Sequence, residues 1–113
     1  MAGGISVHAV DVARGRVADG MLVQIERLRS DGSRARIAEG RIGPSGTLDH
    51  PVVNGEGVDE GTYEVLFHVG AFYGETAPFL DIVPFRFTVG DAAPHYHLPI
   101  KFTPFGFSLY RGA

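Results

Sequence analysis

Cysteine is absent from the sequence, so the chain has no disulfide framework and no thiolate zinc site. No apolar run approaches the length of a membrane-spanning helix. The first four residues lack the basic and apolar regions of a signal peptide. These absences lead us to expect a cytoplasmic protein with no membrane partner.

An excess of positive charge is also absent. Ten Lys and Arg residues against thirteen Asp and Glu residues give a formal net charge of -3. We therefore expect no nucleic-acid partner, because such proteins carry a basic footprint. Hydrophobic residues make up 44% of the sequence and charged residues 20%, which argues against disorder. A length of 113 residues suits a single domain, placed at residues 1–113.

Glycine and proline, by contrast, are frequent, with 16 and 7 residues at short intervals. This spacing is typical of short strands joined by turns, and no segment shows sustained helical periodicity. We predict strands at residues 5–12, 21–28, 35–41, 48–53, 62–69, 82–89, 95–102 and 105–111, and at most one short helix, within residues 70–78. Pro84 suits an edge strand. Seven to eight short strands predict an all-β sandwich.

The histidines are the conspicuous polar residues of these predicted strands. His95 and His97 are two residues apart, and side chains at this spacing in a strand point to the same face, which they would share with Lys101. His8 lies near the other end of the chain, on the same predicted strand face as Ser6. The pattern raises the question of whether these histidines meet.

Spacing alone leaves three interpretations of these histidines open. A pair on a strand is commonly structural or exposed to solvent. Together with a third, remote histidine, such a pair is also the arrangement of a three-histidine zinc site. The third interpretation is general acid–base chemistry, because the pKa of imidazole lies near neutrality. We assign His50 and His68 to structure or solvent, and no Gly-x-Ser-x-Gly nucleophile motif is present.

The resemblance to a known family rests chiefly on three segments. Residues 95–100 read His-Tyr-His-Leu-Pro-Ile, residues 110–113 read Tyr-Arg-Gly-Ala, and residues 6–11 read Ser-Val-His-Ala-Val-Asp. The first two resemble the closing His-Tyr-His-Val-Pro-Leu strand and Tyr-Arg-Gly-Ser tetrapeptide of the transthyretin-related 5-hydroxyisourate hydrolases. The third is similar to the first strand of that family. Residues 61–70 and 78–84 also fit the family.

The resemblance implies a transthyretin-like β-sandwich that assembles as a homotetramer, a dimer of dimers around a central channel. Each channel mouth would hold active sites built from more than one subunit. The implied reaction is hydrolysis of 5-hydroxyisourate, the product of urate oxidation in purine catabolism, by attack of water on a ring carbonyl. The implied partner is this small-molecule substrate, and the reaction requires no metal or organic cofactor.

The resemblance also implies roles for individual residues. His8 and His97 match the catalytic histidines of the family, whereas His95 falls outside the catalytic set. The expected substrate-binding positions are Thr47, Tyr110, Arg111, Gly112 and Ala113.

Two of these positions depart from the family pattern. The family has an arginine after an Asn-x-Asp-Gly turn, but residues 43–47 read Gly-Pro-Ser-Gly-Thr, so Thr47 takes the place of the arginine. An arginine there would bind an anionic, carbonyl-rich substrate through its planar fork of donors. Arg41 and Arg111 are the candidates to compensate for it. Ala113 replaces the final serine and removes a hydroxyl.

These departures leave alternatives open for the function. One is a family member tuned to a different lactam, imide or cyclic carbonyl substrate. Another is a ligand-binding protein without enzymatic activity on the same fold, for which fold analogy alone is weak support.

Overall fold

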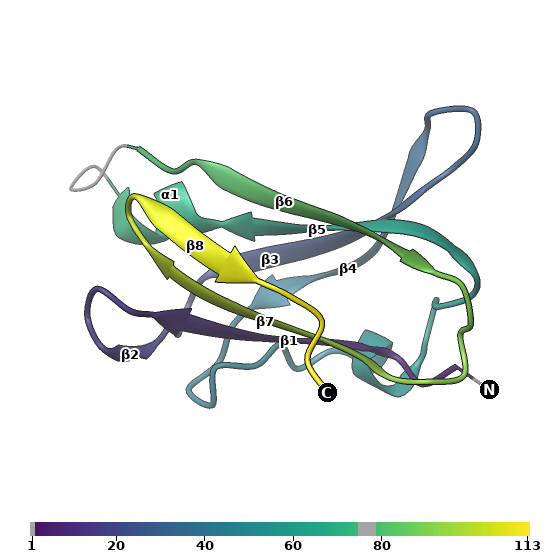
Figure 1. Ribbon diagram of the computed structural model, residues 1–113, viewed down its shortest axis with the longest axis horizontal. Helices are drawn as coiled ribbons and strands as arrows, with labels where there is room; N and C mark the ends of the chain where they lie inside the picture. Colours follow the sequence, from purple (N-terminus) through teal and green to yellow (C-terminus); the bar gives the residue numbers. More distant parts are fainter. Residues whose placement is uncertain (1, 75–78) are drawn as a thin grey trace.

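The computed structural model describes residues 2–74 and 79–113, and in these residues eight strands form two stacked four-stranded sheets (Figure 1). The strands are β1 (Ile5–Asp11), β2 (Arg16–Val17), β3 (Leu22–Leu28), β4 (Arg34–Arg41), β5 (Gly61–His68), β6 (Ile82–Val89), β7 (Tyr96–Thr103) and β8 (Gly106–Leu109). A 3₁₀ helix, η1 (Pro51–Asn54), and a short α-helix, α1 (Val69–Tyr73), complete the described elements. The predicted all-β sandwich is confirmed.

The two sheets differ in topology. The first has the order β2-β1-β7-β8, and its central strands β1 and β7 are parallel to each other. The second has the order β4-β3-β5-β6 and is antiparallel throughout. Because β1 and β7 lie near opposite ends of the chain, the fold places residues from both ends on one face.

Alternation along the strands builds the core between the sheets. In β1 the residues Ile5, Val7 and Ala9 are fully buried, while the residues between them face outward. In β7 the same alternation buries Leu98 and Ile100. Burial of these apolar side chains is the main favourable contribution to folding.

The strand predicted at residues 48–53 is wrong. Leu48 makes only an isolated bridge with Ile42, and the chain then forms the 3₁₀ helix η1. Proline lacks the N–H that a sheet ladder needs but fits the first turn of a helix, and Pro51 occupies that position. His50 caps this turn, since its Nδ1 accepts a hydrogen bond from the backbone N–H of Val52 at 3.0 Å.

The other local predictions fare differently. The helix predicted within residues 70–78 corresponds to α1, although residues 75–78 lie outside the described residues. Pro84 does lie on an edge strand, β6, as predicted. Strand β2 is a missed element, because two residues are too short a run to produce an alternation signal.

Among the described residues, no helix reaches the length and apolar character that crossing a membrane requires.

The outward face of the second sheet is occupied by ion pairs. Arg34 binds both Glu26 and Glu64, while Arg36 binds Glu26 and Arg86 binds Glu64. The hydrogen bond from Arg34 lowers the pKa of Glu64 below its ordinary value. The charged side chains named here are thus paired with one another, which distinguishes this face from the outward face of the first sheet.

Candidate active site

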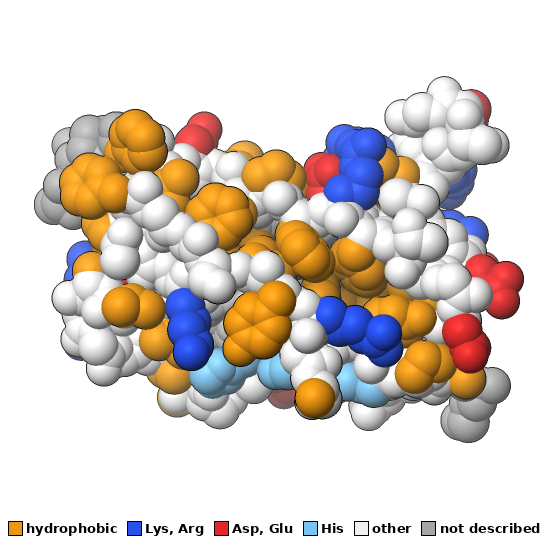
Figure 2. All heavy atoms as spheres, in the orientation of Figure 1, with side chains coloured by type: hydrophobic (Ala, Val, Ile, Leu, Met, Phe, Trp, Pro, Cys, Tyr) orange, Lys and Arg blue, Asp and Glu red, His pale blue; other side chains and the backbone are white. Residues whose placement is uncertain are grey.

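The outward face of the first sheet carries the histidines, and histidine side chains line the lower part of the face shown in Figure 2. Ser6 and His8 of β1 and His97 of β7 occupy the outward positions of their strands, as predicted. The parallel register sets Ser6 opposite His97. On the other side of β7, the N–H of Gly112 donates to the carbonyl of His97 at 2.7 Å.

A second row of residues lies beside the first. His8 forms a bridge with Thr47 on one side and pairs with Pro99 of β7 on the other. The register between β7 and β8 places Tyr110 next in this row. Successive residues on one face of a strand are about 7 Å apart. His8 and His97 are therefore neighbours on adjacent rows, although 89 positions separate them in the sequence.

Two glycines leave room for the two imidazole rings. Gly46 has φ +83°, and a Cβ built on it would lie 2.8 Å from Nε2 of His8. A Cβ on Gly112 would lie 2.8 Å from Cδ2 of His97. Both distances are too short for carbon, so each ring is packed directly against a glycine backbone.

The environment of His97 favours its neutral form. Partial burial lowers the pKa of His97 below its ordinary value, and the proximity of His8 and His95 lowers it further because like charges repel. The side chain of Ser6 lies between the histidines of β7. Its Oγ is 2.7 Å from Nδ1 of His97 and 2.7 Å from Nε2 of His95. A neutral imidazole can accept a proton, which is the requirement for a general base.

An open pocket of about 460 Å³ lies beside His97, and this volume is typical of small-molecule sites. Its lining includes Ser6, Thr47, His97 and Asp49. The hydroxyl of Thr47 is 2.6 Å from that of Ser45. Polar groups from β1, β7 and the loop after β4 thus converge on one hollow.

Among the described residues, neither arginine expected to compensate for Thr47 makes a hydrogen bond or ion pair with the histidines. Arg41 donates a hydrogen bond to the carbonyl of Gly20 at 3.0 Å, at the second sheet. The guanidinium of Arg111 lies 4.3 Å from the ring centroid of Tyr96, whose side chain is buried on the core side of β7. The substrate-binding role of Arg111 therefore stays a prediction, as does that of Ala113, which is exposed at the end of the chain.

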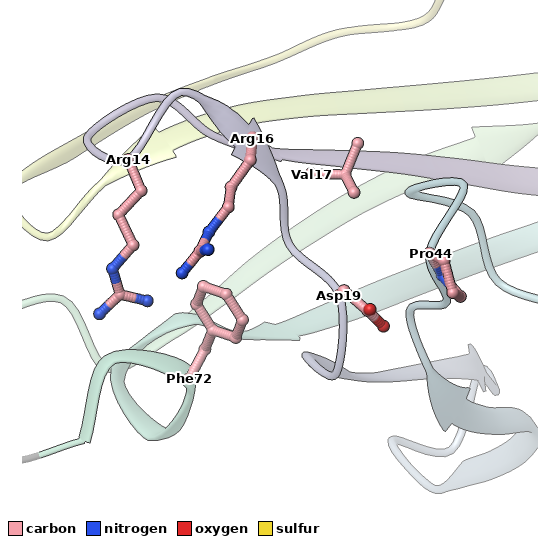
Figure 3. A pocket seen from close by; sticks show the side chains of 6 residues that line it. All are labelled: Arg14, Arg16, Val17, Asp19, Pro44 and Phe72. Carbon is pink, nitrogen blue, oxygen red and sulfur yellow. The ribbon is translucent and has the colours of Figure 1, made fainter.

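Two further arginines belong to a separate hollow. Figure 3 shows Arg14 and Arg16 extending toward the ring of Phe72, with Asp19 and Pro44 on the other side of the cavity. Arg14 also forms an ion pair with the buried Asp11 at 3.7 Å. Neither Arg14 nor Arg16 lines the pocket beside His97.

Lys101 also lies on the histidine face. It pairs with Val10 of β1 and Ser108 of β8, so it belongs to the row next to that of His8. Lys101 is exposed, and its ammonium makes no ion pair or hydrogen bond with the described residues. Its position on one face with His95 and His97 agrees with the predicted alternation.

The described part of the chain contains no group of three or more His, Asp and Glu side chains arranged to hold a metal ion. His95 instead uses both ring nitrogens in hydrogen bonds. Its Nδ1 lies 2.6 Å from the carbonyl oxygen of Gly3, and its Nε2 contacts Ser6.

Sequence reasoning missed two residues of this site. Ser6 was placed on the right face by alternation, but its contacts depend on the parallel pairing of the first and seventh strands, which no local pattern reveals. Gly46 belongs to the Gly-Pro-Ser-Gly stretch before Thr47, and its contact with His8 arises only because this stretch folds back against β1. The signal available for Gly46 was its place beside Thr47.

Comparison with known proteins identifies relatives over nearly the whole chain. The sequence is 39% identical to a 5-hydroxyisourate hydrolase from Deinococcus radiodurans, over 97% of this chain and 96% of that protein. It is 38% identical to 5-hydroxyisourate hydrolase 2 from Rhizobium meliloti, over 98% of this chain and 97% of that protein.

A crystal structure of (S)-allantoin synthase superposes on the fold with a TM-score of 0.86 and 28% identity. The match covers 99% of this chain but only 44% of that longer chain. The sequence profile of the HIUase/Transthyretin family matches residues 5–112. The chain therefore belongs to the HIUase/Transthyretin family.

Proposed function

We propose that this protein is a 5-hydroxyisourate hydrolase of urate degradation. The observation that carries the proposal is the juxtaposition of His8 and His97 on adjacent rows of one sheet face, where His97 lines an open pocket. The full-length relatives carry this enzyme name, and their similarity extends over nearly the whole chain. Two imidazoles on one sheet face, with His97 lining the pocket, supply what hydrolysis of a cyclic amide needs, a base for water and a donor for the leaving nitrogen.

In the proposed reaction His97 acts on water. Its lowered pKa keeps the imidazole neutral at pH 7, so it accepts a proton while the water oxygen bonds to the ring carbonyl carbon. The carbon–nitrogen bond then breaks, and His8 polarises the ring and passes a proton to the departing nitrogen. The total number of protons on the pair is unchanged, and passage of one proton from His97 to His8 through solvent restores the starting state. Holding both groups against one substrate supplies orientation.

We further propose that Lys101 supplies the positive charge that Thr47 lacks. The proposal rests on register, since Lys101 occupies the row next to His8 and carries an ammonium with no partner in the described residues. A lysine places a point charge on a flexible stem, which binds an anionic ring without the bidentate geometry of arginine. Because lysine and arginine bind an anion with different geometry, we expect this enzyme to keep the substrate of the family but to bind it differently.

Replacing Lys101 with methionine is expected to raise KM for 5-hydroxyisourate about tenfold, with a smaller change in kcat. The loss of one charge-assisted hydrogen bond, worth about 1.5–3 kcal/mol, accounts for this effect. Steady-state kinetics check it, with Lys101→Arg as the control that keeps the charge. Adding Thr47→Arg to the Lys101→Met variant should lower KM again. An unchanged KM in Lys101→Met would remove Lys101 from substrate binding.

Activity should persist into mildly acidic solution. The acid limb of the kcat/KM profile is expected to have its midpoint below pH 6.5, the ordinary pKa of histidine, because burial and the neighbouring His8 and His95 lower the pKa of His97. Protonation of His97 removes the base, so the rate falls as the pH drops through this pKa. The profile is measured after subtraction of the spontaneous decay. A midpoint above pH 7 would contradict this assignment of the base.

We also propose that the active unit is a homotetramer. Strands β6 and β8 are sheet edges with unpaired backbone groups, which are templates for pairing with another copy. Hydrophobic side chains gather beside them, at the upper left of Figure 2. Exposed apolar residues of this region are Phe79, Ile82, Phe105 and Phe107. A monomer in sedimentation experiments at assay concentration would contradict a site shared between subunits.

A comparison of substrates tests the proposed function against its alternatives. The purified protein is assayed with 5-hydroxyisourate and with uncharged cyclic amides and imides under the same conditions. The highest kcat/KM for 5-hydroxyisourate is the expected result. A clear preference for an uncharged ring would instead indicate a retuned enzyme, and tight binding without turnover of any ring would indicate a ligand-binding protein.

A further inference from the structure

A chain of three hydrogen bonds leads from the first residues of the protein to His97. The carbonyl oxygen of Gly3 lies 2.6 Å from Nδ1 of His95. Nε2 of His95 lies 2.7 Å from Oγ of Ser6, and the same Oγ lies 2.7 Å from Nδ1 of His97. The chain ends at His97, whose Nε2 makes no hydrogen bond with the described residues.

The backbone holds these groups in place. Besides the register that sets Ser6 beside His97, the N–H of Gly3 donates to the carbonyl of Ala92 at 2.8 Å, and the N–H of Tyr96 donates to the carbonyl of Gly4 at 2.9 Å. A Cβ on Gly3 would lie 2.4 Å from the carbonyl carbon of Pro94, so only glycine permits this approach. The fold thus holds the carbonyl oxygen of Gly3, the acceptor at the start of the hydrogen-bond chain, in place.

The carbonyl at one end gives the chain of hydrogen bonds a direction. A carbonyl oxygen only accepts, so Nδ1 of His95 must carry the proton. In a neutral His95, Nε2 is then an acceptor, and the hydroxyl of Ser6 donates to it. The oxygen of Ser6 is left to accept, so Nδ1 of His97 carries the proton that it donates. Nε2 of His97 consequently keeps its lone pair.

The opposite direction requires an additional charge. If Ser6 donated to His97, its oxygen would have to accept a proton from Nε2 of His95, and both nitrogens of His95 would be protonated. The resulting cation would lie one hydroxyl away from His97, whose pKa is already lowered by burial and by the neighbouring histidines. The neutral arrangement satisfies every donor and acceptor in the chain without this repulsion.

We propose that Ser6 and His95 are positioning residues that hold His97 in the Nδ1–H tautomer and so direct an unprotonated Nε2 at the substrate pocket. The inference rests on the proposed function, in which His97 is the base. It also gives His95 a role, as the residue that orients Ser6 rather than as a group that touches substrate. The hydrogen bond made by one ring nitrogen sets the tautomer of the other, which is the way proteins commonly fix a reactive histidine.

The tautomer is measured directly by long-range ¹H–¹⁵N correlation spectra of the imidazole rings at pH 8. Signals of His97 are identified by their loss in His97→Asn. The expected result for the wild-type protein is a protonated Nδ1 and an unprotonated Nε2. Ser6→Ala should shift His97 toward the Nε2–H tautomer, which free histidine favours, while Ser6→Thr should retain the Nδ1–H form because it keeps the hydroxyl.

Kinetics supply the second readout. Ser6→Ala and His95→Phe are each expected to lower kcat for 5-hydroxyisourate about tenfold or more, with KM changed less than threefold, because a base in the wrong tautomer binds substrate but cannot take the proton. Ser6→Thr should recover most of the lost kcat. A purely structural role would affect Ser6→Thr and Ser6→Ala alike.

Two outcomes would overturn the inference. One is a wild-type His97 with the proton on Nε2, and the other is a Ser6→Ala variant with an unchanged tautomer and unchanged kcat. Failure of the proposed function is distinguishable from both. A wild-type protein that shows the expected tautomer but does not hydrolyse 5-hydroxyisourate would refute the substrate and leave the hydrogen-bond chain standing.

Discussion

Replacing His97 with asparagine is expected to lower kcat for 5-hydroxyisourate by about 10²- to 10⁴-fold, the range attributable to a general base. Asparagine keeps a polar side chain of similar breadth but has no group that accepts a proton near pH 7. The remaining rate would come from orientation of the substrate in the pocket. The measurement is the steady-state rate, corrected for spontaneous decay of the substrate.

The matched control for this variant is His68→Asn. His68 belongs to the second sheet and makes its hydrogen bond to Gln24 at 2.7 Å, away from the candidate site. His68→Asn makes the same chemical change at a distant position, so it should leave kcat within about threefold of the wild-type value. Equal losses in both variants, or a loss below threefold in His97→Asn, would contradict the assignment of His97 as the base.

Replacing Gly46 with alanine is the second change with a large expected effect. The new methyl group would lie 2.8 Å from Nε2 of His8 and 2.8 Å from Cγ1 of Val17, so the His8 ring must move. A displacement of about 1 Å in a reacting group can cost about 10²-fold in rate, and we expect a loss in kcat of that order. The thermal melting temperature is measured alongside the rate to separate displacement of the ring from loss of the fold.

Gly32→Ala is the control for backbone strain. Gly32 has φ +86°, against +83° for Gly46, but nothing described lies within 4 Å of its Cβ position. Alanine in this left-handed conformation costs about 1–2 kcal/mol at either position. Both variants therefore share this strain, Gly46→Ala adds the cost of its two close contacts, and only Gly46→Ala should lose most of its activity. Similar activity in the two variants would mean that contact with Gly46 does not hold the His8 ring.

Several features of the site could be predicted from sequence because they depend on local alternation. The outward placement of His8 and His97 follows from a period of two residues, and β1 and β7 keep that period along their whole length. His50 has the structural role of capping η1, and it also lines the pocket beside His97.

Other features depend on contacts that local patterns do not contain. The parallel pairing of β1 with β7 brings Ser6 to His97, and only the fold determines this register. The strand predicted at residues 48–53 failed because Pro51 begins a 3₁₀ turn, for which His50 provides the cap. The place of Arg111 likewise depends on tertiary packing, since its guanidinium lies over Tyr96 on the core side of β7.

The most direct test of the account compares the wild-type protein with the double variant His8→Asn/His97→Asn. Urate oxidase generates 5-hydroxyisourate, and its decay is followed by absorbance with each protein at micromolar concentration. The wild-type protein should accelerate the decay well above the spontaneous rate, and the double variant should not. A wild-type protein that leaves the spontaneous rate unchanged would refute the assignment of His8 and His97 as the catalytic pair.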